Sequence, residues 1–265
     1  MNRVLLAVTA GLVSVMAGPV FAADLATKAA PFAARFSWSG CYAGAHAGGA
    51  WATNTLTDPV QLVQDNVAPG FPGFTTAGPF GTGVSQSGAV IGGQIGCDYQ
   101  FASNLVIGIE GAASGATLKG SQTVGLRDSL PDTALVSVQT DFIPAVTGRI
   151  GYAFDHWLFY GKGGVAQSST QYAANGFFTA AGAQVPGAAF AFVGRSLTIG
   201  YTAGAGVEWA FTDDWSARLE YDYYGFGSKT VTLVDNIGGG SGPMSVKQSI
   251  QTLKLGVNFH VPTWQ

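Results

Sequence analysis

Single charged residues stand inside the most apolar and aromatic segments of this 265-residue chain. In RIGYAFDHWLFYGKGGVA, residues 149–166, Arg149 and Lys162 lie in two apolar runs that are joined by the polar pair Asp155-His156. Nine residues of this kind recur along the chain: Asp98, Glu110, Arg149, Lys162, Glu208, Arg218, Glu220, Asp222 and Lys254. A buried charge needs a partner of opposite sign. Four cations and five carboxylates therefore indicate mutual ion pairing.

Residues that could support catalysis or bind a cofactor are sparse. The sequence contains no phosphate-binding loop, no Cys/His cluster with metal-ligand spacing and no nucleophile motif. His46, His156 and His260 fall in or beside three different predicted strands, and we interpret His156 beside Asp155 as a polar turn. We predict no enzymatic activity, no metal and no cofactor.

The composition argues against nucleic acid as a partner and against an ordinary soluble domain. Charged residues make up 10% of the chain, whereas soluble domains contain about 25%. Aromatic residues make up 12%, there are 39 glycines, and the net charge is -3. The chain therefore has no basic field that would attract nucleic acid.

The N-terminal residues MNRVLLAVTAGLVSVMAGPVFAAD have the organisation of a secretory signal peptide. Arg3 precedes a short apolar run, and small residues follow Pro19. We predict a signal peptide over residues 1–22, a flexible N-terminal arm over 23–37 and one folded domain over 38–265.

From Trp38 onward, apolar residues alternate with small or polar ones, as in half-buried β-strands. Eight strands are predicted, at 40–53, 88–101, 104–118, 136–154, 156–169, 196–211, 215–230 and 247–260. Short connections alternate with long ones. The long connections are at 54–87, 119–135, 170–195 and 231–246. Outer-membrane barrels have short periplasmic turns and long external loops. We therefore predict an all-β fold, an eight-stranded antiparallel transmembrane β-barrel with short periplasmic turns and long extracellular loops.

The two faces of each predicted strand differ in character. In the strand at 215–230, Trp215, Leu219 and Tyr221 share one face, and Arg218 and Glu220 share the other. Six aromatic residues gather near the short-turn end: Tyr99, Tyr152, Trp157, Trp209, Trp215 and Phe259. Aromatic rings favour the headgroup region of a bilayer. The apolar face is therefore predicted to meet lipid, and the charged face to line the interior.

The charged interior has two interpretations. An eight-stranded barrel has just enough room inside for its side chains, so the nine charges are predicted to close the lumen as an ion-pair network. The alternative is a small selective pore that the same charges line.

Two further features concern the barrel wall. Cys41 and Cys97 fall on the outward face near the short-turn end of the first two strands, so we predict a disulfide between them. Pro144 lies within the strand at 136–154 and removes one ladder donor. We therefore expect a bulge or irregularity close to it.

Four segments carry a resemblance to a known family: AADLATKAAP, WSGCYAGAHAGG, GGQIGCDYQF and LKLGVNFH. They resemble the small outer-membrane barrel proteins of alphaproteobacteria, the Omp25/RopB-like porin family within the OmpA-like transmembrane barrel superfamily. The resemblance implies an eight-stranded barrel in the outer membrane of a Gram-negative bacterium, with roles in envelope integrity, host contact or minor solute passage. Such chains commonly end in Phe, a signal for the barrel-assembly machinery, whereas here HVPTWQ follows Phe259.

We therefore expect a structural and surface-interaction protein whose external loops carry the binding. Its expected partners are outer-membrane lipid, the barrel-assembly machinery during insertion, and a host or envelope partner. Two alternatives stay open: a small passive porin for solutes, and a lipocalin-like soluble ligand carrier.

Overall fold

The computed structural model describes residues 36–58, 80–125, 133–180, 183–237 and 240–262. All of them belong to one compact unit, Arg35–Gln265. The predicted signal peptide and nearly all of the predicted arm lie outside the described residues, and both stay predictions. The start of the barrel domain at residue 38 likewise stays a prediction. Within the described ranges, no helix is long and apolar enough to cross a membrane.

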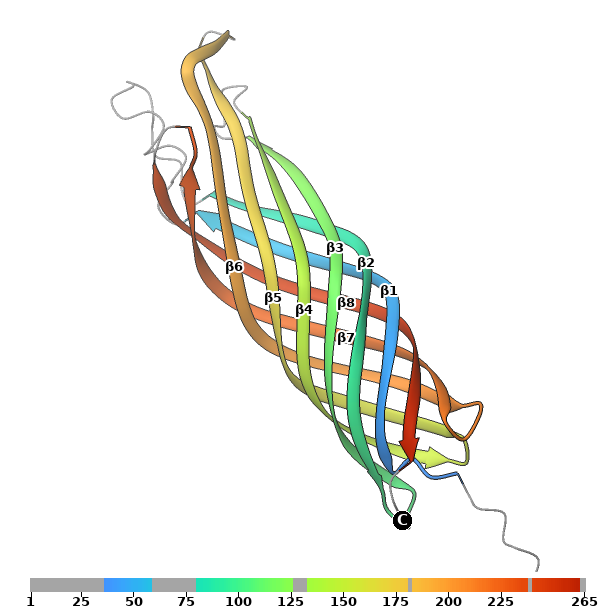
Figure 1. Ribbon diagram of the computed structural model, residues 1–265. Helices are drawn as coiled ribbons and strands as arrows, with labels where there is room; N and C mark the ends of the chain where they lie inside the picture. Colours follow the sequence, from blue (N-terminus) through green and yellow to red (C-terminus); the bar gives the residue numbers. More distant parts are fainter. Residues whose placement is uncertain (1–35, 59–79, 126–132, 181–182, 238–239, 263–265) are drawn as a thin grey trace, which may run out of the picture. The chain divides into compact units, whose positions relative to one another are not determined.

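The described residues form eight antiparallel strands that pair in chain order, and β1 also pairs with β8 (Figure 1). The strands are β1 (Gly40–Asp58), β2 (Phe80–Gln100), β3 (Leu105–Gly125), β4 (Thr133–Phe154), β5 (Trp157–Ala180), β6 (Ala183–Ala210), β7 (Trp215–Asp235) and β8 (Ser241–Pro262). The pairing of β1 with β8 closes the sheet into a barrel, so neither of these two strands is a free edge. The predicted all-β, eight-stranded barrel is confirmed.

The register of the strands gives the barrel a regular slant. A path from Ala43 that follows the paired residues from strand to strand returns to β1 at Thr53, ten residues nearer the loop end. Such a stagger accompanies strands that are tilted relative to the barrel axis. It decides which inward-facing side chains meet, because residues that pair across neighbouring strands lie at different heights.

The turns at one end of the barrel are tight, as predicted. Asp155-His156 alone joins β4 to β5, and Asp155 has a positive φ of 53°. Asn104, in the turn between β2 and β3, has a φ of 64°. Asn and Asp adopt this left-handed conformation more readily than other side-chain-bearing residues, which explains their use at these positions.

The strands extend further toward the loop end than predicted. At the short-turn end, the strand limits agree with the predicted ones to within two residues. At the opposite end, β5 continues to Ala180 and β6 begins at Ala183, so most of the predicted loop 170–195 is strand. This Ala- and Gly-rich segment keeps the period of two, and its inward residues Tyr172, Ala174, Phe190 and Phe192 are buried inside the barrel.

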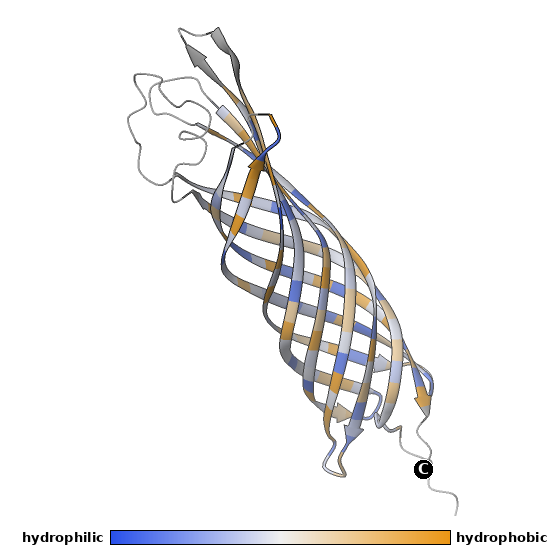
Figure 2. Cartoon of the chain, turned by 60° about the vertical axis from the view of Figure 1, so that its left-hand side comes forward, coloured by the Kyte–Doolittle hydropathy of each residue, from blue (hydrophilic) through white to orange (hydrophobic). Residues whose placement is uncertain are grey.

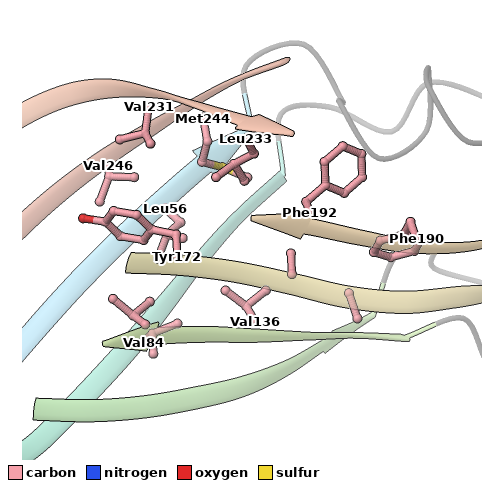
Figure 3. Packing of buried hydrophobic residues seen from close by; sticks show 13 residues of the cluster. Leu56, Val84, Val136, Tyr172, Phe190, Phe192, Val231, Leu233, Met244 and Val246 are labelled. Carbon is pink, nitrogen blue, oxygen red and sulfur yellow. The ribbon is translucent and has the colours of Figure 1, made fainter. Parts of the chain in front are cut away.

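Apolar residues fill the interior at three levels, which corrects the prediction of a uniformly small or charged inner face. The turn-end cluster contains Trp38, Val106, Ala153, Leu158, Tyr160 and Ala210, with Phe36 packed against it. The middle cluster contains Ala50, Ala52, Val90, Leu118, Ile143, Ala166, Tyr224, Phe226 and Ile250. The loop-end cluster contains Leu56, Val84, Ala134, Val136, Val138, Tyr172, Ala174, Phe190, Phe192, Val231, Leu233, Met244 and Val246 (Figure 3). Figure 2 shows hydrophobic and hydrophilic residues following one another in short bands along the strands.

A bulge lies close to Pro144. The pairing of β4 with β5 shifts between Thr140 and Phe142, and the pairing with β3 shifts opposite it. The bulge reverses the alternation, so Asp141 lies on the outer wall beside Gln139 and Gln171 rather than inside. A strict period of two counted back from Arg149 would put Asp141 on the inward face, and the extra residue of the bulge breaks that count.

Candidate functional site

Nine charged side chains face the interior and form what we call the ion-pair layer. They are Asp98, Glu110, Arg149, Lys162, Glu208, Arg218, Glu220, Asp222 and Lys254, and each side chain is at most 4% exposed. Seven of the eight strands contribute at least one member. These are the nine residues that the sequence singled out, and the structure brings all of them together.

Arg149 lies on one side of this layer. Its guanidinium forms an ion pair with Asp98, and its Nη1 lies 3.2 Å from the Oε2 of Glu208. The rings of Tyr42 and Tyr160 lie 4.8 Å and 4.9 Å from the guanidinium carbon. Two carboxylates and two aromatic faces surround the Arg149 guanidinium, and all four interactions stabilise its positive charge.

Glu220 lies at the other side and contacts three cations. Its carboxylate lies 2.8 Å from the Nζ of Lys162, 3.0 Å from the Nζ of Lys254 and 3.6 Å from the Nη1 of Arg218. Asp222 shares the two lysines, at 3.2 Å and 2.6 Å. The lysines are therefore held between two carboxylates, which offsets the large cost of removing ammonium groups from water.

Glu110 links the two sides of the layer. It accepts a hydrogen bond from the Tyr42 hydroxyl at 2.8 Å and pairs with both Arg218 and Lys162. The Tyr160 hydroxyl donates to Glu220 in the same way, at 2.8 Å. Neither tyrosine was predicted from the sequence, although Tyr160 lies two positions before Lys162 and therefore shares its face.

A serine, a histidine and a carboxylate meet near the turn end. Ser216 donates to Glu208 at 2.5 Å, Asn258 donates to Glu208 at 2.6 Å, and the Nε2 of His260 lies 2.9 Å from the Ser216 hydroxyl. The same Nε2 lies 3.6 Å from Glu208. A catalytic triad needs the acid on the other ring nitrogen, and Ser216 is completely buried. This group therefore completes the hydrogen bonding of Glu208.

The other two histidines have separate partners. The ring nitrogens of His46 lie 2.6 Å from Gln94 and 2.8 Å from Ser114, and both contacts are buried. His156 lies 3.0 Å from its neighbour Asp155 in the turn. Within the described part of the chain, no group of three or more His, Cys, Asp or Glu residues has the arrangement of a metal site.

A second polar level separates the middle cluster from the loop-end cluster. It consists of Asn54, Gln86, Thr140, Ser168, Thr170 and Gln248, all at most 4% exposed. Gln248 accepts from Ser168 at 2.9 Å and donates to Thr140 at 3.1 Å, and Asn54 donates to Gln86 at 2.8 Å. This amide–hydroxyl layer crosses the interior with neutral groups only.

The six aromatic residues of the predicted interface all lie on the outer wall. Tyr99, Tyr152, Trp157, Trp209, Trp215 and Phe259 are between 40% and 58% exposed. Trp157 stacks on Trp209 with ring centroids 5.8 Å apart, and Trp215 packs on Phe259 at 5.1 Å. Register explains both contacts, since each pair is directly opposite across neighbouring strands.

Cys41 and Cys97 are directly opposite in the pairing of β1 with β2, and a disulfide joins them. The prediction of this disulfide is confirmed. Both cysteines lie at outward positions near the turn end, so the covalent bond fastens the first two strands outside the ion-pair layer.

A closed antiparallel barrel with an apolar outer wall and buried internal charges defines the class of outer-membrane β-barrel proteins. The chain matches the family described as "Outer membrane protein beta-barrel domain" over residues 19–259 and belongs to that family. It is therefore a protein of the outer membrane of a Gram-negative bacterium.

Two relatives from Brucella melitensis and Brucella suis are each named "31 kDa outer-membrane immunogenic protein". Each is 28% identical over 260 residues, which cover 95% of this chain and 98% of the relative. Among solved structures, the outer membrane protein OprG from Pseudomonas aeruginosa matches with a TM-score of 0.48 and 13% identity, over 84% of this chain and 97% of that chain.

Proposed function

We propose that the protein is a closed, non-conducting barrel that supports the outer membrane and presents its loops as a surface for interaction. The observation that carries this proposal is the filling of the interior. Two polar levels, the ion-pair layer and the amide–hydroxyl layer, alternate with three apolar clusters along the barrel. A solute on this path would have to displace paired charges and packed rings together.

The charges favour closure over a selective pore. A pore-lining charge keeps access to water, whereas these side chains are at most 4% exposed and are compensated by one another. Trp38 adds a further obstruction at the turn end, where it is 1% exposed and packs with Phe36 and His260. The small passive porin is therefore the second candidate.

The interaction role is supported by the relatives. Both Brucella proteins are named as outer-membrane and immunogenic proteins, and exposure of segments at the cell surface is one way in which an outer-membrane protein meets antibodies. An extracellular position for the loop end would give this chain the same opportunity. We expect no enzymatic activity, because the one Ser–His–carboxylate group within the described residues is buried and has the wrong order of contacts.

Conductance of the refolded full-length protein in planar bilayers tests the proposal. Wild type and Lys162→Ala are both expected to show no reproducible channels, because Tyr160, Arg218 and the apolar clusters still fill the space. Reproducible wild-type channels that Arg149→Ala or Lys162→Ala alters in size or selectivity would instead establish the porin. A large porin that is measured in the same bilayers provides the positive control.

A second experiment tests presentation of the loops. An epitope tag inserted in residues 59–79 should be detected by antibody on intact cells, whereas a tag inserted between Asp155 and His156 should be detected only after the membrane is permeabilised. The reverse result would exclude the proposed orientation and with it the interaction surface.

A further inference from the structure

Four cations lie on the outer wall of the barrel toward its loop end. Lys119 on β3, Arg195 on β6, Lys229 on β7 and Lys247 on β8 are all exposed. Among side chains that the structure describes, Asp141 is the one carboxylate on the outer wall of the strands. The turn end has the opposite sign, with Asp155, Asp213 and Asp214 exposed there. The outer wall is thus electrically polarised along the barrel.

The register places the four cations at a common height. Corrected for the ten-residue stagger of the sheet, each lies roughly 13 to 15 residues above the turn end, on the order of 35 Å at about 3.3 Å per residue and a tilt of about 40°. The apolar band of an outer-membrane barrel is about 25 Å tall. With the aromatic residues at the turn-end edge of that band, the cations lie beyond its other edge, at headgroup depth.

Two of these cations flank a groove. Lys119, Gln139, Gln171 and Arg195 are successive register partners on β3, β4, β5 and β6. A groove with a volume of about 710 Å³ follows this row, and Ser121 and Ser137 also line it. Three strand spacings of about 4.8 Å separate Lys119 from Arg195, or roughly 14 Å along the sheet. The two cations therefore offer two separate places for an anionic group, one at each end of the row.

The middle of the row differs chemically from its ends. The side-chain amides of Gln139 and Gln171 each donate to Asp141 at 2.7 Å. Their carbonyl oxygens are left as acceptors for hydroxyl groups, while the Asp141 carboxylate repels an anion from the centre. At one end, Arg195 donates from Nε and Nη2 to Ser169 at 3.3 Å and 2.9 Å, which holds its guanidinium against the wall. The groove therefore favours anions at both ends and hydroxyl groups between them.

The wall on the membrane side of the row is apolar. Phe142, Leu197 and Ile199 are 45%, 56% and 75% exposed there. A molecule whose polar part occupied the groove could lay hydrocarbon chains directly along these side chains. This continuity distinguishes a lipid from a free phosphate or a soluble sugar.

We propose that this groove binds the headgroup of a lipid in the loop-side leaflet that carries two phosphates on a sugar backbone. Lys119 and Arg195 each pair with one phosphate, with the planar guanidinium suited to a bidentate contact. Gln139, Gln171, Ser121 and Ser137 bind the sugar hydroxyls. The acyl chains pack on the apolar wall at Phe142, Leu197 and Ile199.

Binding of bis-phosphorylated lipid A to the refolded full-length protein tests the proposal, with native mass spectrometry in neutral detergent as the measurement. Loss of both charged contacts in the double variant Lys119→Gln/Arg195→Gln should weaken binding by about tenfold or more. Lys247→Gln, an outward cation on β8 away from the groove, is the matched control and should stay within about twofold of wild type, since it keeps both phosphate contacts. Raised salt should weaken wild-type binding.

Several results would overturn the proposal. Equal binding of wild type and double variant would exclude the groove, and an equal loss in Lys247→Gln would indicate diffuse attraction only. Equal binding of phosphatidylglycerol, fully dephosphorylated lipid A or inorganic phosphate would remove the requirement for two phosphates on a sugar. Heat-modifiable gel mobility reports folding of each variant. If the double variant does not fold, the single variants Lys119→Gln and Arg195→Gln provide the same comparison.

Discussion

The Nζ of Lys162 on β5 lies 2.8 Å from the Oε1 of Glu220 on β7, although these two strands do not pair. The strand between them, β6, contributes Gly204 opposite Lys162 and Gly206 opposite Glu220. An added Cβ on Gly204 would collide with the Asp222 carboxylate, and one on Gly206 would lie 2.5 Å from the Tyr160 hydroxyl oxygen. These two glycines therefore leave room for Asp222 of the ion-pair layer and for Tyr160, which donates to Glu220.

Removal of the Glu220 charge should strongly destabilise the barrel. Glu220→Gln leaves Lys162, Lys254 and Arg218 buried with one carboxylate fewer, and the breaking of such a pair costs about 3 to 5 kcal/mol. Urea unfolding in lipid vesicles measures the change. Asp141→Asn, on the outer wall, should change the free energy of unfolding by about 1 kcal/mol or less. Equal stability of Glu220→Gln and wild type would refute the structural importance of the layer.

A methyl group at Gly204 should also destabilise the protein. An added Cβ there would lie 2.2 Å from the Asp222 Oδ1 and 2.6 Å from the Tyr221 carbonyl oxygen. Overpacking of this kind costs about 1 to 3 kcal/mol. The control is Gly111→Ala, whose Cβ would have no atom within 4 Å. Similar unfolding curves for the two variants would contradict the prediction.

The Cys41–Cys97 disulfide should stabilise the folded barrel. Cys41→Ser/Cys97→Ser should lower the free energy of unfolding by about 2 to 4 kcal/mol, the usual range for a cross-link of this span. Reducing agent should produce the same loss in wild type and no change in the double variant. Two alkylatable thiols in the native oxidised protein would show that the bond does not form.

Trp157 and Trp209 should lie at headgroup depth if the turn-end aromatics meet the bilayer interface. In variants that retain only one of these tryptophans, fluorescence quenching should be strongest with lipids labelled near the headgroup. A variant that retains only Trp38, which is 1% exposed inside the barrel, should be quenched weakly at every depth. Strongest quenching of Trp209 by labels at the chain ends would contradict this placement.

The sequence predicted which residues form the outer wall of the barrel better than it predicted which residues fill the interior. Alternation assigned Arg149 and Lys162 to the interior and Trp157 and Trp209 to the outer wall, where the structure places them. The same rule failed at Asp141, because the bulge in β4 adds a residue that reverses the faces beyond it. The strands also extend beyond their predicted ends toward the loop end. There the outward residues become polar, so the difference in polarity between the two faces, on which the prediction depends, is lost.

The interior beyond the charges was not predicted. Phe190 and Phe192 are at most 1% exposed within the loop-end cluster, yet they stand in a segment whose Ala and Gly content suggested a loop. Tyr42 and Tyr160 were not predicted as part of the site, although each lies an even number of residues from an inward side chain, His46 or Lys162. Parity shows that such a ring points inward, but it does not show which carboxylate the hydroxyl meets across the lumen.

The sequence by itself determined the number of strands, the end with short turns, the face that each strand turns inward and the two cysteines that meet. These properties are local, because they depend on a two-residue period and on neighbouring strands. Only the tertiary structure decided that Arg149 meets Asp98 and Glu208, and that Glu220 meets three cations. Such contacts cross the lumen, so they depend on the closure and the stagger of the whole barrel, which no single strand encodes.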